Sequence, residues 1–581
     1  MRDSTTLPMP GESDEWWRGA VVYQIYPRSF KDSNGDGIGD LPGIIAQLDY
    51  LAALGVDAIW ISPFFQSPMK DFGYDVSDYR AVDPLFGTLA DFEQLVAGAH
   101  ARGIKVIIDQ VISHTSDQHA WFQESRQNRD NPKASWYIWA DPRPDGSPPN
   151  NWLSIFGGSA WQWESRRRQY YLHNFLSAQP DLNFHEEAVQ QQLLDDVEYW
   201  CHRGVDGFRF DACNFHFHDR ELRDNPPAAA GVTLSSVRAE NPYSMQQHCF
   251  DKNQPENLLF LERLRAALDH HGAVGLGEIG DEDAAPLMAS YTAGSDRLHM
   301  AYSFGLLTST FSAAHIRLQV QQLEASINPV GGWTCWSLSN HDVPRVLSRW
   351  GGMAPDRRQA KLLLGMLGSL RGTLCLFQGE ELGLTEAEVA FDDIQDPYGI
   401  AFWPEYKGRD GCRTPFPWSS NAAHGGFSTA KPWLPMAAAH LPEAVDIQEK
   451  AGNSVLRFYQ CFLAWRARQP VLKTGEIVFF EVPEPVLMYV RHAKNVAMLC
   501  VFNLGAETVR VQLMATLSTT FSGLAASDLA PLAGHGLTGA TLEQDNLVLA
   551  PYGGLFARLD LSEASSQSVP VTSGLTSGDS P

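Results

Sequence analysis

The sequence predicts an α/β protein built on a (β/α)8 TIM barrel, with a small domain inserted after strand 3 and a C-terminal antiparallel β domain. Three observations lead to this fold class. Apolar runs of strand length alternate eight times with helical periodicity, which is typical of a closed parallel barrel. The alternation is interrupted from about Thr115 to Asn183. Beyond about residue 470 it gives way to short strands separated by turns.

Each predicted barrel strand is a short, mainly apolar run, the pattern expected of strands buried on both faces. Because the parallel strands of a barrel end at one rim, the side chains that follow them should gather there. The strands are Ala20–Tyr26, Val56–Ile61, Ile104–Asp109, Gly207–Asp211, Ala273–Glu278, Leu298–Ser303, Trp333–Leu338 and Gly372–Phe377. The predicted helices between them include Leu41–Leu54, Leu89–Arg102, Glu186–Arg203, Glu256–His270 and Leu362–Leu370.

Two long polar segments interrupt the repeats. The stretch after strand 3 is rich in Trp, Pro, Asn and Gly and is too long for a simple loop, which predicts an inserted domain. A second excursion, Asn214–Pro255, predicts a flap over the site. The predicted organisation is an N-terminal tail at 1–15, the barrel at 16–114 and 184–472, the inserted domain at 115–183, the C-terminal β domain at 473–562, and a disordered Ser/Gly/Thr/Pro-rich tail at 563–581.

Composition narrows the class of partner. The 581 residues carry a net charge of −24, which argues against nucleic acid or an anionic membrane as a partner. No apolar stretch approaches the roughly 20 residues that span a bilayer. The eight cysteines are scattered singly, so free thiols are expected, and the N-terminus has no signal-peptide pattern, so we expect a cytoplasmic protein.

A loop after the first strand carries oxygen ligands at alternate positions. This spacing suits a hard cation, with Ca²⁺ the first choice and Mg²⁺ the second. The loop resembles the start of an EF-hand, but Gly43 stands where the closing Glu would be, so a true EF-hand is rejected. The alternative is an Asp/Asn/Gly turn without metal. The predicted ligands are Asp32, Asn34, Asp36, Asp40 and the backbone carbonyl of Ile38.

The fourth strand carries a cation and an anion two residues apart. Residues i and i+2 of a strand share a face, so Arg209 and Asp211 should emerge together, although a purely structural ion pair is the alternative. Glu278 and Asp342 follow the fifth and seventh strands. Three carboxylates at one rim repel one another and raise at least one pKa. A raised carboxylic acid beside an ionised one is the pair that glycosidic bond cleavage requires.

Here the sequence resembles a known family. Four segments resemble, in order, the signature regions of the α-amylase superfamily, glycoside hydrolase family 13. Gln179-Pro-Asp-Leu-Asn183 and the run from Gly408 to Trp418 resemble its α-glucosidase and oligo-1,6-glucosidase branch. The resemblance extends from Trp16 to the β domain. The four segments are Asp109…His114, Gly207-Phe-Arg-Phe-Asp211, Glu278 and Asn340-His-Asp342.

The resemblance implies a role for each residue of the site. Asp211 would be the nucleophile, Glu278 the general acid and then base, and Asp342 the stabiliser that holds the sugar 2- and 3-hydroxyls. Arg209 would orient Asp211 and keep it ionised. Retention of the anomeric configuration would follow. His114 and His341 would donate hydrogen bonds to the glucosyl ring; read without the family, either is more simply a satisfied core histidine.

The same branch implies a closed pocket. Asp71 and Arg413 would pair behind the first sugar and leave room only for a non-reducing end, with a surface salt bridge as the alternative. Tyr74 would stack on that sugar. Phe156 and Phe175 would line the pocket, although aromatic residues of an inserted domain more often form its own core.

The predicted protein is therefore a retaining, exo-acting α-glucosidase. It would release glucose from α-1,4-linked disaccharides and short oligosaccharides of the maltose type, with some transglucosylation, and the small side chain of Ala212 favours the α-1,4 bond. It would be a monomer or a homodimer. The alternatives are an oligo-1,6-glucosidase, a sucrose- or trehalose-converting glucosyl transferase or isomerase on the same fold, and, remotely, a non-catalytic sugar-binding relative.

Overall fold

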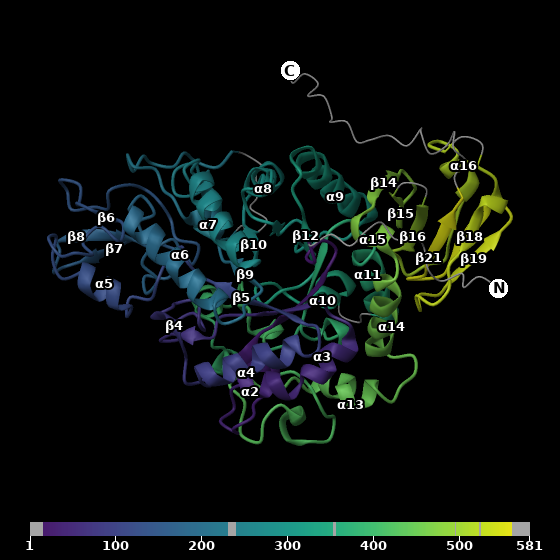
Figure 1. The fold of residues 1–581 in the computed structure, drawn as a ribbon, viewed down its shortest axis with the longest axis horizontal. Helices are drawn as coiled ribbons and strands as arrows, with labels where there is room; N and C mark the ends of the chain where they lie inside the picture. The colour runs from purple at the N-terminus through teal and green to yellow at the C-terminus, as the bar shows by residue number, and fades with distance from the viewer. Residues whose placement is uncertain are drawn as a thin grey trace, which may run out of the picture.

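The fold comes from a computed structural model that describes residues 15–229, 237, 240–352, 356–493, 496–521 and 524–560. The two predicted tails fall outside these residues, apart from Glu15. No helix in the described part of the chain is both long and apolar enough to span a bilayer. In Figure 1 the barrel lies in the middle, with the inserted sheet and the C-terminal sheets at opposite ends.

The predicted barrel is confirmed. Its parallel strands run in the order β11-β10-β9-β5-β2-β1-β13-β12, and a parallel bridge between Ala301 and Thr334 joins the two ends. All eight are almost wholly buried, which explains their apolar sequences. They are β1 Val21–Ile25, β2 Ala58–Ile61, β5 Lys105–Gln110, β9 Gly207–Phe210, β10 Val274–Ile279, β11 Met300–Ser303, β12 Cys335–Ser337 and β13 Thr373–Phe377.

Most predicted helices form with small changes of boundary. The segment predicted as one helix, Leu41–Leu54, is two, because Gln47 leaves helical geometry at φ −110° and ψ 9°. A further helix begins at Arg357, five residues before the predicted Leu362, because the side chain of Asp356 caps its first turn. The main helices are α2 Leu41–Ala46, α3 Leu48–Leu54, α4 Leu89–His100, α6 Glu187–Cys201, α7 Asn257–His271, α8 Ala284–Thr292, α9 Ala313–Ile327, α10 Val346–Gly351, α11 Arg357–Leu367 and α14 Val455–Ala467.

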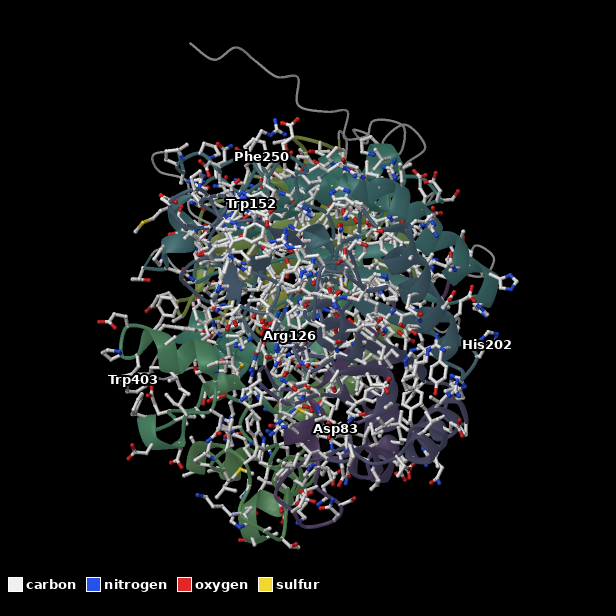
Figure 2. All side chains as sticks on the ribbon, turned by 90° about the vertical axis from the view of Figure 1, so that its left-hand side faces the viewer. Asp83, Arg126, Trp152, His202, Phe250 and Trp403 are labelled. Atoms are coloured by element: carbon white, nitrogen blue, oxygen red, sulfur yellow. The ribbon has the colours of Figure 1, made fainter. Side chains whose placement is uncertain are left out.

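The inserted segment folds around its own small antiparallel sheet, in the order β6-β8-β7. Its strands are β6 Trp139–Ala140, β7 Trp161–Glu164 and β8 Gln169–Leu172. Figure 2 views the molecule from this side, where Trp152 and Phe250 pack together. Phe250 belongs to the excursion that follows β9, so that excursion rests on the inserted sheet. In it the described residues form two short turns of 3-10 helix, η1 Cys213–Phe215 and η2 Pro242–Met245.

The C-terminal region is antiparallel, as the change of period predicted. A five-stranded sheet and a three-stranded sheet share one hydrophobic core. The first contains β14 Glu476–Phe480, β15 Val486–Ala493, β16 Val496–Asn503, β21 Gly554–Leu559 and β18 Leu529–Pro531, and the second β17 Val509–Val511, β20 Asn546–Leu549 and β19 Ala540–Glu543.

Candidate active site

Arg209 on β9 is the centre of the barrel mouth. Its side chain is completely buried. Asp109 at the end of β5 lies opposite Arg209 in the strand register, and the two side chains pair at 2.8 Å. The same nitrogen of Arg209 lies 2.5 Å from Asp211, two residues further along the chain. The i and i+2 positions of one strand and the neighbouring strand end therefore converge, as the periodicity predicted.

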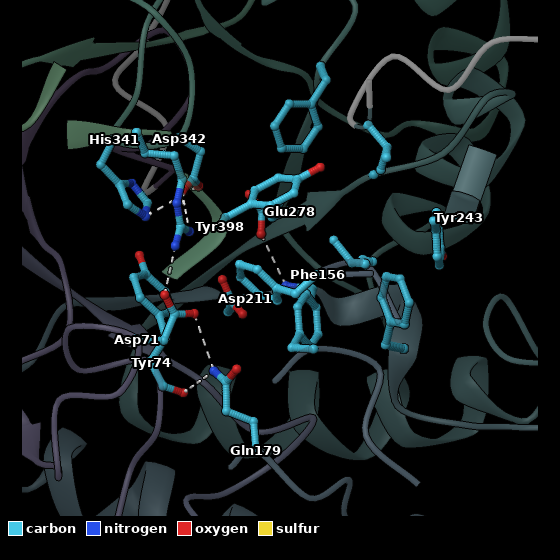
Figure 3. A pocket seen from close by; sticks show the side chains of 18 of the residues that line it. Asp71, Tyr74, Phe156, Gln179, Asp211, Tyr243, Glu278, His341, Asp342 and Tyr398 are labelled. Carbon is cyan, nitrogen blue, oxygen red and sulfur yellow. Dashed lines mark hydrogen bonds and ion pairs between the residues drawn. The ribbon is translucent and has the colours of Figure 1, made fainter. Parts of the chain in front are cut away.

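Glu278 reaches the same guanidinium from β10. Its Oε2 lies 2.7 Å from the second terminal nitrogen of Arg209, and the backbone N–H of Ala212 donates to this oxygen at 3.2 Å. The hydroxyl of Tyr302, on β11, donates to Oε1 at 3.0 Å. One arginine thus holds Asp211 and Glu278 side by side. Figure 3 shows these two carboxyl groups at the pocket.

Asp342 follows β12 and sits in a different charge environment. One of its oxygens accepts from Arg409 at 3.2 Å and from Arg413 at 3.0 Å. The other lies 3.3 Å from Nε2 of His341. The structure therefore brings the three predicted carboxylates to one mouth. Among the described residues, Asp342 has two arginine partners, whereas Asp211 and Glu278 share one.

The pKa values differ accordingly. Burial raises the pKa of Asp211 to about 6 and that of Glu278 to about 7, and the Arg209 charge opposes both shifts. Burial alone would raise the pKa of Asp342 too, but His341 and the two arginines lower it below its usual range. The site therefore holds two carboxyl groups that exchange protons near neutral pH and one that stays ionised.

The predicted pair of Asp71 with Arg413 is wrong. Asp71 is buried as expected, but Arg409 pairs with it at 2.8 Å. The two arginines flank a short 3-10 turn, Asp410–Cys412. Arg413 turns beneath the mouth, where its Nε donates to the backbone carbonyl of His341 at 2.6 Å. Arg409 and Arg413 both belong to the run from Gly408 to Trp418 that resembles the family. Only their three-dimensional positions could therefore show which of them pairs with Asp71.

The two predicted histidines are buried and neutral. Burial lowers the pKa of His114 to about 4 and that of His341 well below its ordinary value. The Nε2 of His114 donates to the backbone carbonyl of Tyr74 at 3.0 Å. His341 accepts from Gln24 at 2.8 Å on Nδ1, which leaves its Nε2–H for Asp342. The ring of Tyr74 stacks on His341 at 5.2 Å.

The three carboxylates and the two histidines line a cavity of about 280 Å³, together with Asp71, Tyr74 and Arg409. Phe156 and Phe175 lie in its wall, as predicted, and Phe156 also contacts the guanidinium of Arg409 at 5.4 Å. Gln179, which belongs to a family motif but has no predicted role of its own, donates to Asp71 at 3.3 Å (Figure 3). The lining residues without an individual prediction include Arg409, Gln179, Ile155, Asn214, Phe215, Val237, Tyr243, Lys252, Phe304, Val343, Pro344, Tyr398 and Tyr406.

The predicted cation loop lies apart from the cavity, between the first strand and α2. Asp32 accepts from the backbone N–H of Asn34 at 3.0 Å and from that of Gly37 at 2.9 Å. Asp36 accepts in the same way from Ile38 at 2.8 Å. These bonds curve the loop, and its all-oxygen donor set fits a hard cation chemically. In the part of the chain that the structure describes, no three His, Cys, Asp or Glu side chains are grouped to hold a metal, so the site stays a prediction.

The fold and the site together define a class of protein. A parallel barrel whose mouth presents a buried arginine, two proton-exchanging carboxyl groups and a permanently ionised third has the parts of a barrel glycoside hydrolase. Residues 24–475 match the family described as "Alpha amylase, catalytic domain". The chain belongs to the α-amylase family, glycoside hydrolase family 13.

Individual relatives are similar over nearly the whole chain. A "Probable alpha-glucosidase" of Rhizobium meliloti (strain 1021) is 52% identical over 96% of this chain and 99% of its own. An "Oligo-1,6-glucosidase" of Heyndrickxia coagulans is 37% identical over 85% of this chain and 93% of its own.

Solved structures of related enzymes are also similar to nearly the whole chain. The crystal structure of an "alpha-glucosyl transfer enzyme, XgtA" has a TM-score of 0.90 and 58% identity, and the match covers 94% of this chain and 99% of that one. The "trehalulose synthase MutB from Pseudomonas mesoacidophila MX-45" has a TM-score of 0.82 and 32% identity, with 95% and 100% covered.

Proposed function

We propose that this protein is a retaining, exo-acting α-glucosidase that releases glucose from the non-reducing end of α-1,4-linked disaccharides and short oligosaccharides. The observation that carries the proposal is the single buried arginine that binds both Asp211 and Glu278. This arrangement keeps the two carboxyl groups close and near neutral pKa, as a nucleophile and a general acid need.

The reaction would proceed in two displacements. Asp211 attacks C1 of the glucosyl unit while Glu278 gives its proton to the glycosidic oxygen, so the C1–O bond breaks and a covalent glucosyl ester forms. The Glu278 carboxylate then takes a proton from water, whose oxygen attacks C1 and releases Asp211. Two inversions give net retention.

Asp342 would stabilise the transition state. Because it stays ionised across the neutral range, it can accept hydrogen bonds from sugar hydroxyls while positive charge develops at C1. The neutral imidazoles of His114 and His341 would help to position the same ring.

The exo mode rests on the closed side of the cavity. Asp71, Arg409 and Asp342 form a continuous ion-pair chain, and Gln179 donates to Asp71 behind it. A polysaccharide could pass this barrier only by breaking buried ion pairs, whereas a terminal glucose can end against it.

Transglucosylation is the second proposed activity. The cavity wall beyond the carboxylates is largely apolar, with Ile155, Phe215, Val237, Phe304 and Pro344. Such a wall would bind the organic part of an acceptor alcohol and exclude water from the glucosyl ester. The 58% identity to a glucosyl transfer enzyme supports this activity, and the name of the Heyndrickxia relative keeps the α-1,6 bond as the alternative linkage.

The test is incubation with maltose, isomaltose, sucrose, trehalose and starch, with the products and their anomeric form followed by NMR. The proposal expects fast release of α-glucose from maltose, oligosaccharides larger than the substrate at high maltose concentration, and slow attack on starch. Cleavage of isomaltose that is faster than cleavage of maltose would favour the alternative function, an oligo-1,6-glucosidase. Fast attack on starch, or β-glucose as the first product, would reject the proposal.

We also propose that the Asp32–Asp40 loop binds one structural Ca²⁺, or Mg²⁺ in its place. Dialysis against EDTA should lower the melting temperature, and added Ca²⁺ should restore it, whereas the Asp36→Ala variant should not respond to either. A wild-type melting temperature that is insensitive to EDTA would reject the site.

A further inference from the structure

A second cleft opens on the inserted domain and shares no residue with the catalytic cavity. Its volume is about 350 Å³. Arg129, Arg167 and Arg220 line it, and no Asp or Glu is among the described residues of its wall. Arg129 pairs with Asp141 at 2.6 Å, which leaves the charges of Arg167 and Arg220. In a chain with a net charge of −24, this cleft is a local excess of positive charge.

Arg167 is buried and forms no direct ion pair with a described carboxylate, although the charge of Asp141 acts on it from a greater distance. Its side chain donates to Gln169 at 3.0 Å and to two backbone carbonyls, and it lies 4.2 Å from the centre of the Trp139 ring. Only 7% of the residue is exposed, and no carboxylate of the described chain lies within ion-pair distance. Neutral acceptors therefore fix the guanidinium in place, while Nη2 has no hydrogen-bond partner among the described residues.

Three other polar groups of the cleft are donors without an acceptor in the described chain, whereas Arg129 pairs with Asp141 and Asn183 donates to the backbone carbonyl of Ser135. Gln169 uses its oxygen for Arg167, so its NH₂ group has no acceptor in the described chain. His218 is 8% exposed and, within the same residues, makes no hydrogen bond through its ring. Arg220 is exposed and forms no ion pair with any residue that the structure describes. Donors that lack a protein acceptor are available to a ligand, and an anion is the ligand that several cationic and polar donors favour.

We propose that this cleft binds a phosphate group, either as the inorganic ion or as part of a phosphorylated sugar. The planar guanidinium groups of Arg167 and Arg220 match the oxygens of a phosphate. The Gln169 amide and the N–H of a neutral His218 supply further donors. The apolar wall formed by Ile138, Trp139 and Leu222 would lie against the remainder of a phosphorylated sugar.

The test is isothermal titration of the full-length protein with sodium phosphate and with glucose 6-phosphate, at constant ionic strength set with sodium chloride. The wild type should bind one equivalent. Arg220→Glu should weaken binding roughly tenfold or more, because hydrogen bonds to charged groups contribute about 1.5–3 kcal/mol. His218→Phe keeps an aromatic ring, removes the donor, and should also weaken binding.

Arg166→Glu is the matched control. Arg166 is exposed and adjacent in sequence to Arg167 but does not line the cleft, so the same change of charge there should leave the affinity within about twofold. Melting temperatures and maltose hydrolysis establish that each variant is folded. Tighter binding of glucose 6-phosphate would assign the phosphorylated sugar, and equal affinities would assign the phosphate group alone.

Three results would overturn the proposal. The first is the absence of saturable binding by the wild type. The second is an affinity that Arg220→Glu leaves unchanged. The third is loss of phosphate binding when a glucose-like inhibitor fills the catalytic cavity, because the anion would then bind at the barrel mouth.

Discussion

Two ionic networks meet at the catalytic cavity, one on the strand ends of the barrel and one on the loops above them. In the strand network a single cation, Arg209, pairs with three carboxylates, Asp109, Asp211 and Glu278. In the loop network two cations, Arg409 and Arg413, pair with three carboxylates, Asp71, Asp342 and Asp396.

The difference in charge balance separates the roles of otherwise similar side chains. The strand network has too little positive charge to overcome burial, so the pKa values of its carboxyl groups rise towards neutrality. Around Asp342, His341 and the two arginines of the loop network together outweigh burial and lower its pKa. Acid–base chemistry thus belongs to the strands, and permanent negative charge belongs to the loops.

The substitution with the largest expected effect is Asp211→Ala, which removes a carboxylate from the strand network. Without the nucleophile no glucosyl ester forms, so kcat for maltose should fall about 10⁴-fold or more, as when the nucleophile of other covalent enzymes is removed. Circular dichroism should show an unchanged fold. Normal maltose hydrolysis by this variant would show that Asp211 is not the nucleophile.

The corresponding break of the loop network is Asp342→Asn, which removes the charge but keeps the shape. We expect kcat to fall roughly 10²–10³-fold, as when one preorganised stabilising group is lost. Both limbs of the pH profile of the remaining activity should also move to lower pH, because the negative charge of Asp342 raises the pKa values of Asp211 and Glu278. Little loss of kcat, or a profile that moves to higher pH, would contradict the division of roles.

Arg409→Ala tests which arginine closes the pocket. It leaves Asp71 and Asp396 without their partner, and truncating one member of a buried charge pair costs about 2–5 kcal/mol, so kcat/KM should fall roughly 30-fold or more. Activity on starch relative to maltose should rise as the barrier opens. Arg409→Lys should recover part of the loss. If the Arg409→Ala enzyme has the kcat and KM of the wild type, Arg409 does not close the pocket, and Arg413 becomes the candidate again.

Tyr302→Phe is the variant with the smallest expected effect, and it tests the pKa of Glu278 within the strand network. Asp211 must be ionised and Glu278 protonated, so kcat/KM should rise through a pKa of about 6 and fall through one of about 7. The hydroxyl of Tyr302 donates to Glu278 and favours its ionised form, so its loss raises that pKa.

The basic limb of the pH profile should therefore move up by about one pH unit, which is the value of one hydrogen bond to a charged group. The acid limb, set by Asp211, serves as the internal control. A basic limb that stays in place, or an equal shift of both limbs, would show that Tyr302 does not tune Glu278.

Local periodicity accounts for what the sequence determined by itself. Strand runs and the two-residue repeat predicted the barrel, the juxtaposition of Arg209 with Asp211, and the meeting of Asp211, Glu278 and Asp342 at one rim. Each of these features follows from where a strand ends, and a strand end is visible in a few neighbouring residues.

Only the tertiary structure decided the partners of the loop residues. Arg409 and Asp71 are 338 residues apart in sequence, and nothing local separates Arg409 from Arg413. The same holds for the cleft of the inserted domain, where Arg167 and Arg220 come from different segments. Contacts between distant loops depend on how the whole barrel positions those loops. The local sequence around Arg409 and Arg413, which are four residues apart, therefore cannot show which of the two reaches Asp71.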